Sequence, residues 1–187
     1  GIHFENRLRE SPTQNVLAYE YYYNGGGLAI ADFNLDGLPD VYMVSNLEAN
    51  HFYLNRGNFQ FEESTKKVGL VERKGFDTGV TTVDINADGY MDIYLCKSGR
   101  YTQEGPRKNE LFLNLGPGED GFPQFIEVAE EYGLALSAYS TQATFFDYDK
   151  DGDLDMFLIN HDINTYSLDQ IPQLLDTQRK EVGDRLY

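Results

Sequence analysis

The sequence predicts an all-β protein built from three consecutive repeats, and three observations lead to this prediction. Acidic segments of one pattern, D-x-[DN]-x-D-G-x-x-D, begin at Asp32, Asp84 and Asp147. Each segment lies between two short runs of apolar, aromatic and β-branched residues, which are the residue types that favour strands. Two further motifs then recur in the same order, so a whole unit repeats and not a single turn.

The strands expected around the acidic segments are short. Strands are predicted before the segments at 28–31, 80–83 and 143–146, and after them at 41–44, 93–96 and 156–159. A third strand with its turn recurs as His51–Gly57 and Glu110–Gly116, and a fourth strand as Phe61–Leu70 and Phe125–Leu134. One unit therefore reads strand, acidic loop, strand, connector, strand, turn, strand. Four short strands in roughly 60 residues is the size of one β-propeller blade or somewhat larger.

The predicted units span residues 1–68, 69–132 and 133–187, and the last one is truncated. Gly1-Ile2 is similar to the Gly-Leu that ends the other units, and residues 183–187 are similar to the start of a third strand. A propeller closes with four to eight blades, whereas open blades leave unpaired strand edges. We therefore expect a partial β-propeller of about three four-stranded blades. It would be a fragment of a larger propeller, with the remaining blades supplied by the rest of the parent chain.

The charge of the chain argues against two classes of partner. Acidic residues outnumber basic ones by 31 to 15, for a formal charge of −16. Nucleic acids and anionic membrane surfaces both require clustered Lys and Arg, so neither is an expected partner. No apolar run approaches the length of a membrane span, and the single cysteine, Cys96, allows no intrachain disulfide. The acidity serves either solubility or cation binding, and the fixed spacing of many acids favours cations.

The acidic segments have the chemistry of divalent metal sites, and we call residues 32–40, 84–92 and 147–155 loops one, two and three. A hard cation binds six to eight oxygens. Side chains at positions 1, 3 and 5 of a tight loop converge, Gly at position 6 permits the turn, the carbonyl of position 7 turns inward and the carboxylate of position 9 closes the shell. The predicted ligands are Asp32, Asn34, Asp36, the carbonyl of Leu38 and Asp40; Asp84, Asn86, Asp88, the carbonyl of Tyr90 and Asp92; and Asp147, Asp149, Asp151, the carbonyl of Asp153 and Asp155.

An all-oxygen ligand set favours Ca²⁺, up to three ions with one in each loop, ahead of Mg²⁺. The loops are not EF-hands, because position 12 is Met43, Leu95 or Leu158 in place of Glu and the flanks are strands. Plain Asp/Asn/Gly turns are the alternative. Three such turns with an acid at every position 1, 5 and 9 would crowd negative charge without compensation, so metal binding is the preferred interpretation.

These residues resemble the FG-GAP/VCBS repeat family, whose members include the integrin α-subunit propeller and the cartilage acidic protein with its bacterial relatives. The resemblance spans essentially the whole chain. It rests on the three loops and on the segments Asn24–Ile30, Leu54–Gly57 and Ser140–Asp147. It implies a β-propeller with calcium in the hairpin loop between the first two strands of a blade, and an extracellular, cell-surface or periplasmic location. The Phe-Gly and Gly-Ala-Pro elements are degenerate, so integrin-type ligand binding is not carried over.

In an up-and-down blade the metal loops share one face, and the longer inserts, 97–109, 161–184 and the N-terminal stretch to Tyr23, share the other. Long loops on a rigid scaffold often carry recognition, so an unknown protein or glycan ligand is expected on that other face.

No catalytic arrangement of His, Ser or Cys is visible. We therefore expect a calcium-binding, non-enzymatic segment for ligand binding or adhesion. The alternatives are an accessory segment of a carbohydrate-active enzyme, such as a polysaccharide lyase, and a structural spacer. Residues 171–182 are expected to form a short surface helix.

Overall fold

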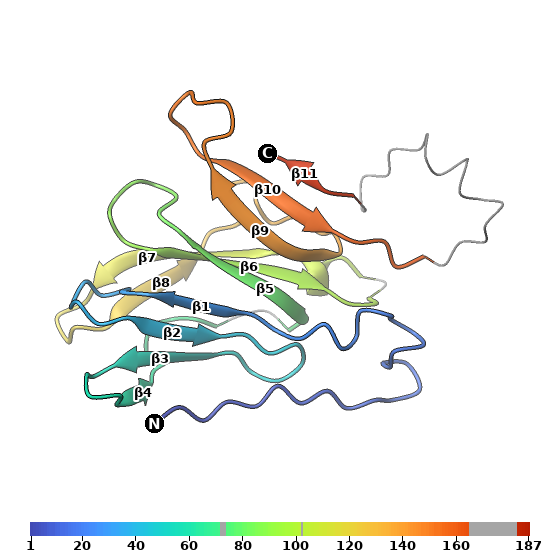
Figure 1. Ribbon diagram of the computed structural model, residues 1–187, viewed down its shortest axis with the longest axis horizontal. Coiled ribbons are helices and arrows are strands. Elements are labelled where there is room, and N and C mark those ends of the chain that lie inside the picture. The colour runs from blue at the N-terminus through green and yellow to red at the C-terminus, as the bar shows by residue number, and fades with distance from the viewer. Residues whose placement is uncertain (72–73, 102, 165–182) are drawn as a thin grey trace.

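The computed structural model describes residues 1–71, 74–101, 103–164 and 183–187, which form three antiparallel sheets (Figure 1). The first sheet contains β1 (Leu28–Ala31), β2 (Asp40–Met43), β3 (His51–Asn55) and β4 (Phe61–Glu63). The second contains β5 (Phe76–Val83), β6 (Asp92–Ser98), β7 (Glu110–Pro117) and β8 (Pro123–Glu127), and the third contains β9 (Ser140–Phe146), β10 (Asp155–Asn160) and β11 (Arg185–Leu186). Within these ranges the one helical element is the 3-10 turn η1 (Gly105–Arg107). The all-β prediction is confirmed.

Each sheet is a meander in which strands adjacent in sequence are neighbours in space. The register pairs Ala31 with Asp40 in the first sheet, and Val83 with Asp92 in the second. In the third sheet Phe146 pairs with Asp155. Each acidic segment therefore begins on the residue after one strand and ends on the first residue of the next, as a hairpin loop between the first two strands of a sheet.

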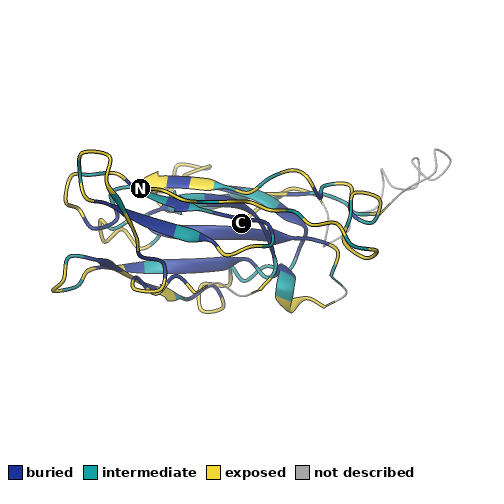
Figure 2. Ribbon diagram, turned by 90° about the horizontal axis from the view of Figure 1, so that it is seen from below, coloured by how far each residue is buried: buried dark blue, intermediate teal, exposed yellow. Residues whose placement is uncertain are grey.

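The sheets pack on one another through apolar layers. Phe33, Phe52 and Phe125 meet edge to face, with ring centroids 5.5 and 5.7 Å from that of Phe33, between the first and second sheets. Tyr94 and Leu158 belong to the layer between the second and third. Burial follows the strands, while the exposed residues collect in the loops at both ends (Figure 2). These layers are the arrangement of successive blades in a propeller-like fold.

The first strands of neighbouring sheets are also joined by side-chain hydrogen bonds. The Thr78 hydroxyl donates to the Ser140 carbonyl at 2.8 Å, and the Thr81 hydroxyl donates to the Ala143 carbonyl at 2.7 Å. Both donors lie on β5 and both acceptors on β9. The inner edges of adjacent blades are therefore held in register as well as in contact.

A buried charged group lies at the junction of the first two sheets. The Lys97 ammonium lies 2.6 Å from the Asp77 carboxylate and 2.9 Å from that of Glu110, and both Lys97 and Glu110 are fully buried. Asn50 of the first sheet's β2–β3 connector donates to the second Asp77 oxygen at 2.7 Å. Burial lowers the pKa of Lys97, but the two carboxylates outweigh it and the pKa is raised above its usual value. Lys97 is therefore a charged residue in the core.

The N-terminal stretch differs in part from its expected position. Its first residues run along the outer strands of the first sheet, where the His3 N–H donates to the Tyr53 hydroxyl at 3.3 Å. The stretch then reaches the end opposite the acidic loops: the Asn6 amide donates to Asn46 of the β2–β3 connector at 2.8 Å, and Tyr19 packs against Phe76 with ring centroids 5.4 Å apart. The helix predicted at 171–182 lies outside the described residues.

Candidate metal centre

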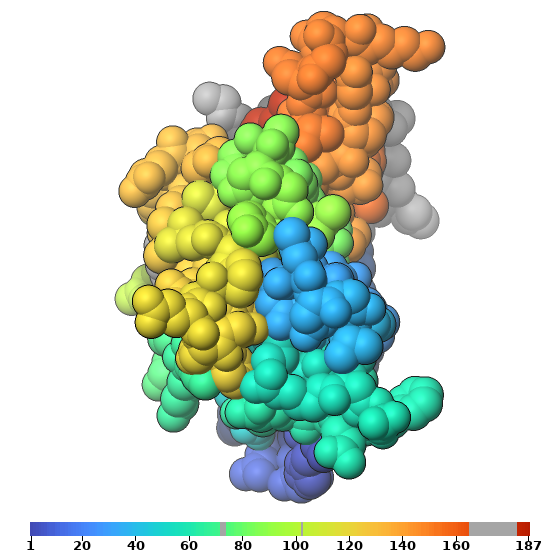
Figure 3. Space-filling model, turned by 90° about the vertical axis from the view of Figure 1, so that its left-hand side faces the viewer, coloured from blue at the N-terminus to red at the C-terminus, as the bar shows by residue number. Residues whose placement is uncertain are grey.

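The three acidic loops lie at the same end of the sheets, on the face seen in Figure 3. Their backbones repeat. Position 4 has positive φ in all three, at 57° for Leu35, 57° for Ala87 and 65° for Lys150. Position 6 is Gly with φ of 85°, 91° and 98°, a conformation that a side chain disfavours. One loop conformation is therefore built three times.

The position 1 carboxylate is held by backbone N–H groups of its own loop. In loop one, Asp32 accepts from the N–H of Asp36 at 3.0 Å and of Gly37 at 2.8 Å. In loop two, Asp84 accepts from the corresponding N–H groups of Asp88 and Gly89 at 3.0 and 2.9 Å. These bonds turn the carboxylate back over the loop.

Positions 3 and 5 join the same network. The Asn34 side-chain oxygen accepts from the Asp36 N–H at 3.3 Å, and its amide group donates to the Asp36 carboxylate at 3.1 Å. Asn86 and Asp88 repeat both contacts, at 3.2 and 2.9 Å. The oxygens of positions 1, 3 and 5 therefore converge around one short stretch of backbone.

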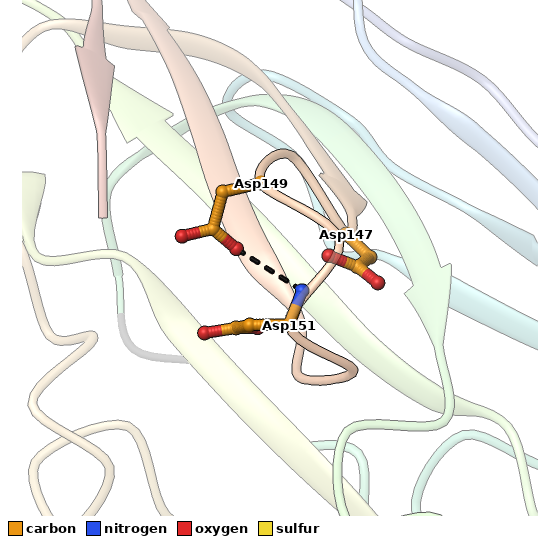
Figure 4. Close-up of side chains that lie close together, drawn as sticks. All are labelled: Asp147, Asp149 and Asp151. Atoms are coloured by element: carbon orange, nitrogen blue, oxygen red, sulfur yellow. Dashed lines mark hydrogen bonds between the residues drawn. The ribbon is translucent and has the colours of Figure 1, made fainter.

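Loop three has an aspartate at position 3, which gives the densest group of acids. Oxygens of Asp147, Asp149 and Asp151 lie within 4.8 Å of one another, and in the described part of the chain this is the one set of three acidic, His or Cys side chains that could hold a metal ion (Figure 4). The Asp151 N–H donates to Asp149 at 3.3 Å. A hydrogen bond with Asp151 and the neighbouring charges raise the pKa of Asp153. Loop three therefore concentrates negative charge that a cation would compensate.

The residues at position 7 lie beside position 5 in every loop. The N–H groups of Leu38, Tyr90 and Asp153 donate to the position 5 carboxylate at 2.9, 2.8 and 3.1 Å. The position 5 side chain is thus fixed from the C-terminal side of the turn. The position 7 carbonyls, which the sequence predicts as ligands, belong to these same residues and therefore lie close to the position 5 carboxylates in sequence.

The position 9 aspartates have a role that the sequence did not reveal. Asp40 and Asp92 are fully buried, and each carboxylate accepts two backbone N–H groups: Asp40 from Phe33 at 3.2 Å and Asn55 at 2.8 Å, Asp92 from Ile85 at 2.9 Å and Asn114 at 2.7 Å. Burial raises the pKa of both to about 6, against the lowering effect of these bonds. Position 9 therefore fastens each loop to its sheet. Each oxygen retains a lone pair for a cation, since one hydrogen bond uses only one of two.

In loop three the position 9 residue is less enclosed. Asp155 is half-buried and accepts from the Tyr148 N–H at 2.7 Å. It does not belong to the group formed by Asp147, Asp149 and Asp151. In loop three the side chains of positions 1, 3 and 5 thus lie close together, and position 9 lies outside this group.

Two asparagines that sequence reasoning did not assign to the site support the loops. Asn55 donates through its side chain to the Pro39 carbonyl at 2.9 Å, and Asn114 donates to the Met91 carbonyl at 3.1 Å. Pro39 and Met91 both occupy position 8. Both asparagines lie in a Leu-Asn-x-Gly motif that recurs in two units, and this recurrence is the feature of the sequence that indicates their shared role.

The residues present fit a hard cation. Every side chain predicted as a ligand, at positions 1, 3, 5 and 9 of the three loops, offers a carboxylate or amide oxygen. Carboxylates and carbonyls are the ligands that Ca²⁺, Mg²⁺ and Mn²⁺ prefer. The chemistry of the donor set and the convergence of its oxygens therefore agree.

Comparison with known proteins agrees with this architecture. A family model described as FG-GAP-like repeat matches residues 15–95, a stretch that contains the first sheet and loops one and two. This region of the chain is similar to an FG-GAP-like repeat. A search of curated proteins found no match to the chain. No helix among the described residues is long and apolar enough to cross a membrane.

Proposed function

We propose that this chain is a calcium-binding β-propeller segment of a secreted or cell-surface protein, non-enzymatic and used for ligand binding or adhesion. The observation that carries the proposal is the convergence of Asp147, Asp149 and Asp151 on a loop whose backbone recurs in loops one and two. A bound cation would supply positive charge to a group of oxygens that otherwise repel one another. Three Ca²⁺ ions would change the formal charge from −16 to about −10.

Calcium is the preferred ion because each loop offers several anionic oxygens. Ca²⁺ accepts six to eight oxygens in variable geometry, whereas Mg²⁺ requires a near-ideal octahedron and retains several waters. The position 9 carboxylate, held back by backbone N–H groups, supports the larger ion, since a longer metal–oxygen distance reaches it more easily. Mg²⁺ is the competitor that the experiment must include.

Calcium titration of site variants tests this proposal. Asp36→Ala, Asp88→Ala and Asp151→Ala each remove position 5 from one loop, and all three residues are exposed. We expect each variant to lose one bound Ca²⁺ by isothermal titration calorimetry. Glu119→Gln, an exposed charge change in the β7–β8 turn of the same face, should lose none. Unchanged stoichiometry in all three loop variants would refute the assignment.

A groove on the opposite face supports the second half of the proposal. It has a volume of about 600 Å³ and lies between the β2–β3 connector, the start of β5 and the segment after β6. Its wall is formed by Asn46, Leu47, Glu48, Lys74, Tyr101 and Pro106. Both polar and apolar groups line it, as expected for recognition of a protein or glycan.

Binding to a panel of glycans and extracellular-matrix proteins tests this face. Glu48 and Lys74 are exposed at the groove, so Glu48→Lys and Lys74→Glu should weaken binding of any ligand found there, while Glu119→Gln on the metal face should not. Degradation of a glycan by the parent protein would favour the lyase alternative. Absence of binding across the panel would favour the spacer.

A further inference from the structure

Asn114 connects loop two to loop one. Its side-chain amide donates to the Phe33 carbonyl at 2.9 Å and to the Met91 carbonyl at 3.1 Å, while its backbone N–H donates to the Asp92 carboxylate at 2.7 Å. Phe33 is position 2 of loop one, and the other two acceptors are positions 8 and 9 of loop two. Asn114 itself is fully buried. One side chain of the second sheet therefore holds backbone from two candidate metal loops.

The two ends of this connection lie next to proposed ligands. Phe33 is flanked by Asp32 and Asn34, which occupy positions 1 and 3 of loop one. Asp92 is position 9 of loop two, and its second oxygen accepts the Ile85 N–H of the same loop at 2.9 Å. A continuous series of hydrogen bonds thus runs from Ile85 of loop two through Asp92 and Asn114 to the backbone between two predicted ligands of loop one.

A second hydrogen bond joins loop one to the second sheet. The Asn34 amide donates to the Gly121 carbonyl in the β7–β8 turn at 2.9 Å. This bond leaves the Asn34 side-chain oxygen directed to its own loop, where it accepts the Asp36 N–H. In Figure 3, loop one lies against this turn and beside loop two, whereas loop three projects away from both.

Loop three provides a natural comparison. Its residues at positions 1, 3 and 5 are all exposed, and its hydrogen bonds among the described residues stay within the loop. It has no counterpart of the Asn114 or Gly121 contacts in this part of the chain. Among the described residues, loop three therefore makes no hydrogen bond to another acidic loop.

We propose that Asn114 is a positioning residue that couples the metal sites of loops one and two, so that occupancy of either loop raises the affinity of the other, while loop three binds independently. This inference rests on the proposed calcium function. An ion in loop two fixes Asp92 and with it Asn114. Loop one then loses less conformational freedom when it binds its own ion, which is positive cooperativity without a large change of shape. By linkage the effect is equal in both directions.

The test measures the Ca²⁺ affinity of loop one while loop two or loop three is disabled. In Asp88→Ala we expect the affinity of loop one to fall by about fivefold or more, the lower end of ordinary coupling between sites. In Asp151→Ala it should stay unchanged. The amide resonances of Leu35 and Gly37, followed by NMR during the titration, report loop one alone.

Asn114→Ala should abolish this dependence, so that Asp88→Ala no longer affects loop one. Asn55→Ala is the matched control, because Asn55 makes the equivalent bond to position 8 of its own loop and donates its backbone N–H to Asp40. It should weaken its hairpin and leave the coupling intact. Loop one affinity that is the same with and without loop two in the unmodified Asn114 background would overturn the inference, whether or not Asn114→Ala folds. No calcium binding at any loop would instead refute the proposed function itself.

Discussion

The carboxylate of Asp40 accepts the backbone N–H of Asn55 at 2.8 Å, and this contact joins the end of an acidic loop to the end of β3. The same relationship recurs between Asp92 and Asn114 in the second sheet, at 2.7 Å. An aspartate that looks like the last ligand of a metal loop is therefore also the acceptor on which the hairpin depends. Loss of position 9 and loss of position 5 should have different consequences.

Asp40→Ala should destabilise the protein even when no divalent ion is present. The substitution leaves the buried N–H groups of Phe33 and Asn55 without an acceptor, at about 1–3 kcal/mol each. Urea unfolding in EDTA measures this loss. The matched variant Asp36→Ala, at an exposed position of the same loop, should lose less than about 1 kcal/mol in EDTA. Equal losses in the two variants would contradict the structural role of position 9.

Gly89→Ala should weaken loop two through the backbone alone. Gly89 has φ of 91°, and a Cβ placed there meets no atom within 4 Å, so only the backbone conformation opposes a side chain. We expect a loss of about 1–2 kcal/mol in the free energy of unfolding. Gly105→Ala is the control, since it also has open space and lies outside the positive φ region. A similar loss at Gly105 would mean that the φ argument fails.

Lys97→Met should be among the most destabilising single substitutions. It leaves Asp77 and Glu110 in the core without the ammonium group between them, and removal of one partner of a buried ion pair costs about 3–5 kcal/mol. The control is Lys108→Met, which breaks the partly exposed ion pair with Glu130 and should cost less than about 1 kcal/mol. Chemical denaturation of both variants gives the comparison. A small loss at Lys97 would show that the buried charges are readily neutralised or solvated.

Acid should destabilise the protein partly through His161. The Nε2 atom of His161 lies 2.9 Å from the Tyr19 hydroxyl, and burial lowers the pKa of the imidazole to about 4, against the opposing effect of Asp162. The pKa of a histidine in an unfolded chain is about 6.5. Between these values the unfolded chain binds a proton that the folded chain does not, so stability falls as pH falls from about 6.5 to about 4 and is unaffected by this group above that range.

The check compares pH profiles of unfolding in EDTA. Relative to the unmodified chain, His161→Phe should lose less stability between pH 6.5 and 4. The buried carboxyl groups of Asp40 and Asp92, whose pKa is raised to about 6, add stability as pH falls through part of this range, and they do so equally in both proteins. His3→Gln, at an exposed site, should leave the slope unchanged. Parallel profiles for the unmodified chain and His161→Phe would assign the acid sensitivity to other groups.

Much of the fold is local enough to be visible in the sequence. The strand predicted at 28–31 is β1, and the strands predicted around loops two and three fall within β5, β6, β9 and β10. This works because alternating β-branched and aromatic residues bounded by Gly, Asn and Asp specify short strands and turns by themselves. The third strands, expected from His51 and Glu110, also begin at these residues.

The features that the sequence did not reveal depend on contacts between distant residues. Lys97 follows an apolar run and carries no local sign that Asp77 and Glu110 will enclose it. The bond between Asn114 and Phe33 spans 81 residues, so no spacing rule predicts it. Position 9 fits a ligand pattern equally well whether or not it also fastens a hairpin. Sequence reasoning therefore found the loops but not how they are attached.

The most direct test of the central claim is unfolding of this chain in excess EDTA and then in millimolar Ca²⁺ or Mg²⁺. A Ca²⁺ concentration about 100 times the dissociation constant should add about 2.7 kcal/mol for each independent site, with a smaller gain from Mg²⁺. The triple variant Asp36→Ala, Asp88→Ala, Asp151→Ala should show no gain. An equal stability of the unmodified chain in EDTA and in Ca²⁺ would contradict the assignment of the acidic loops as calcium sites.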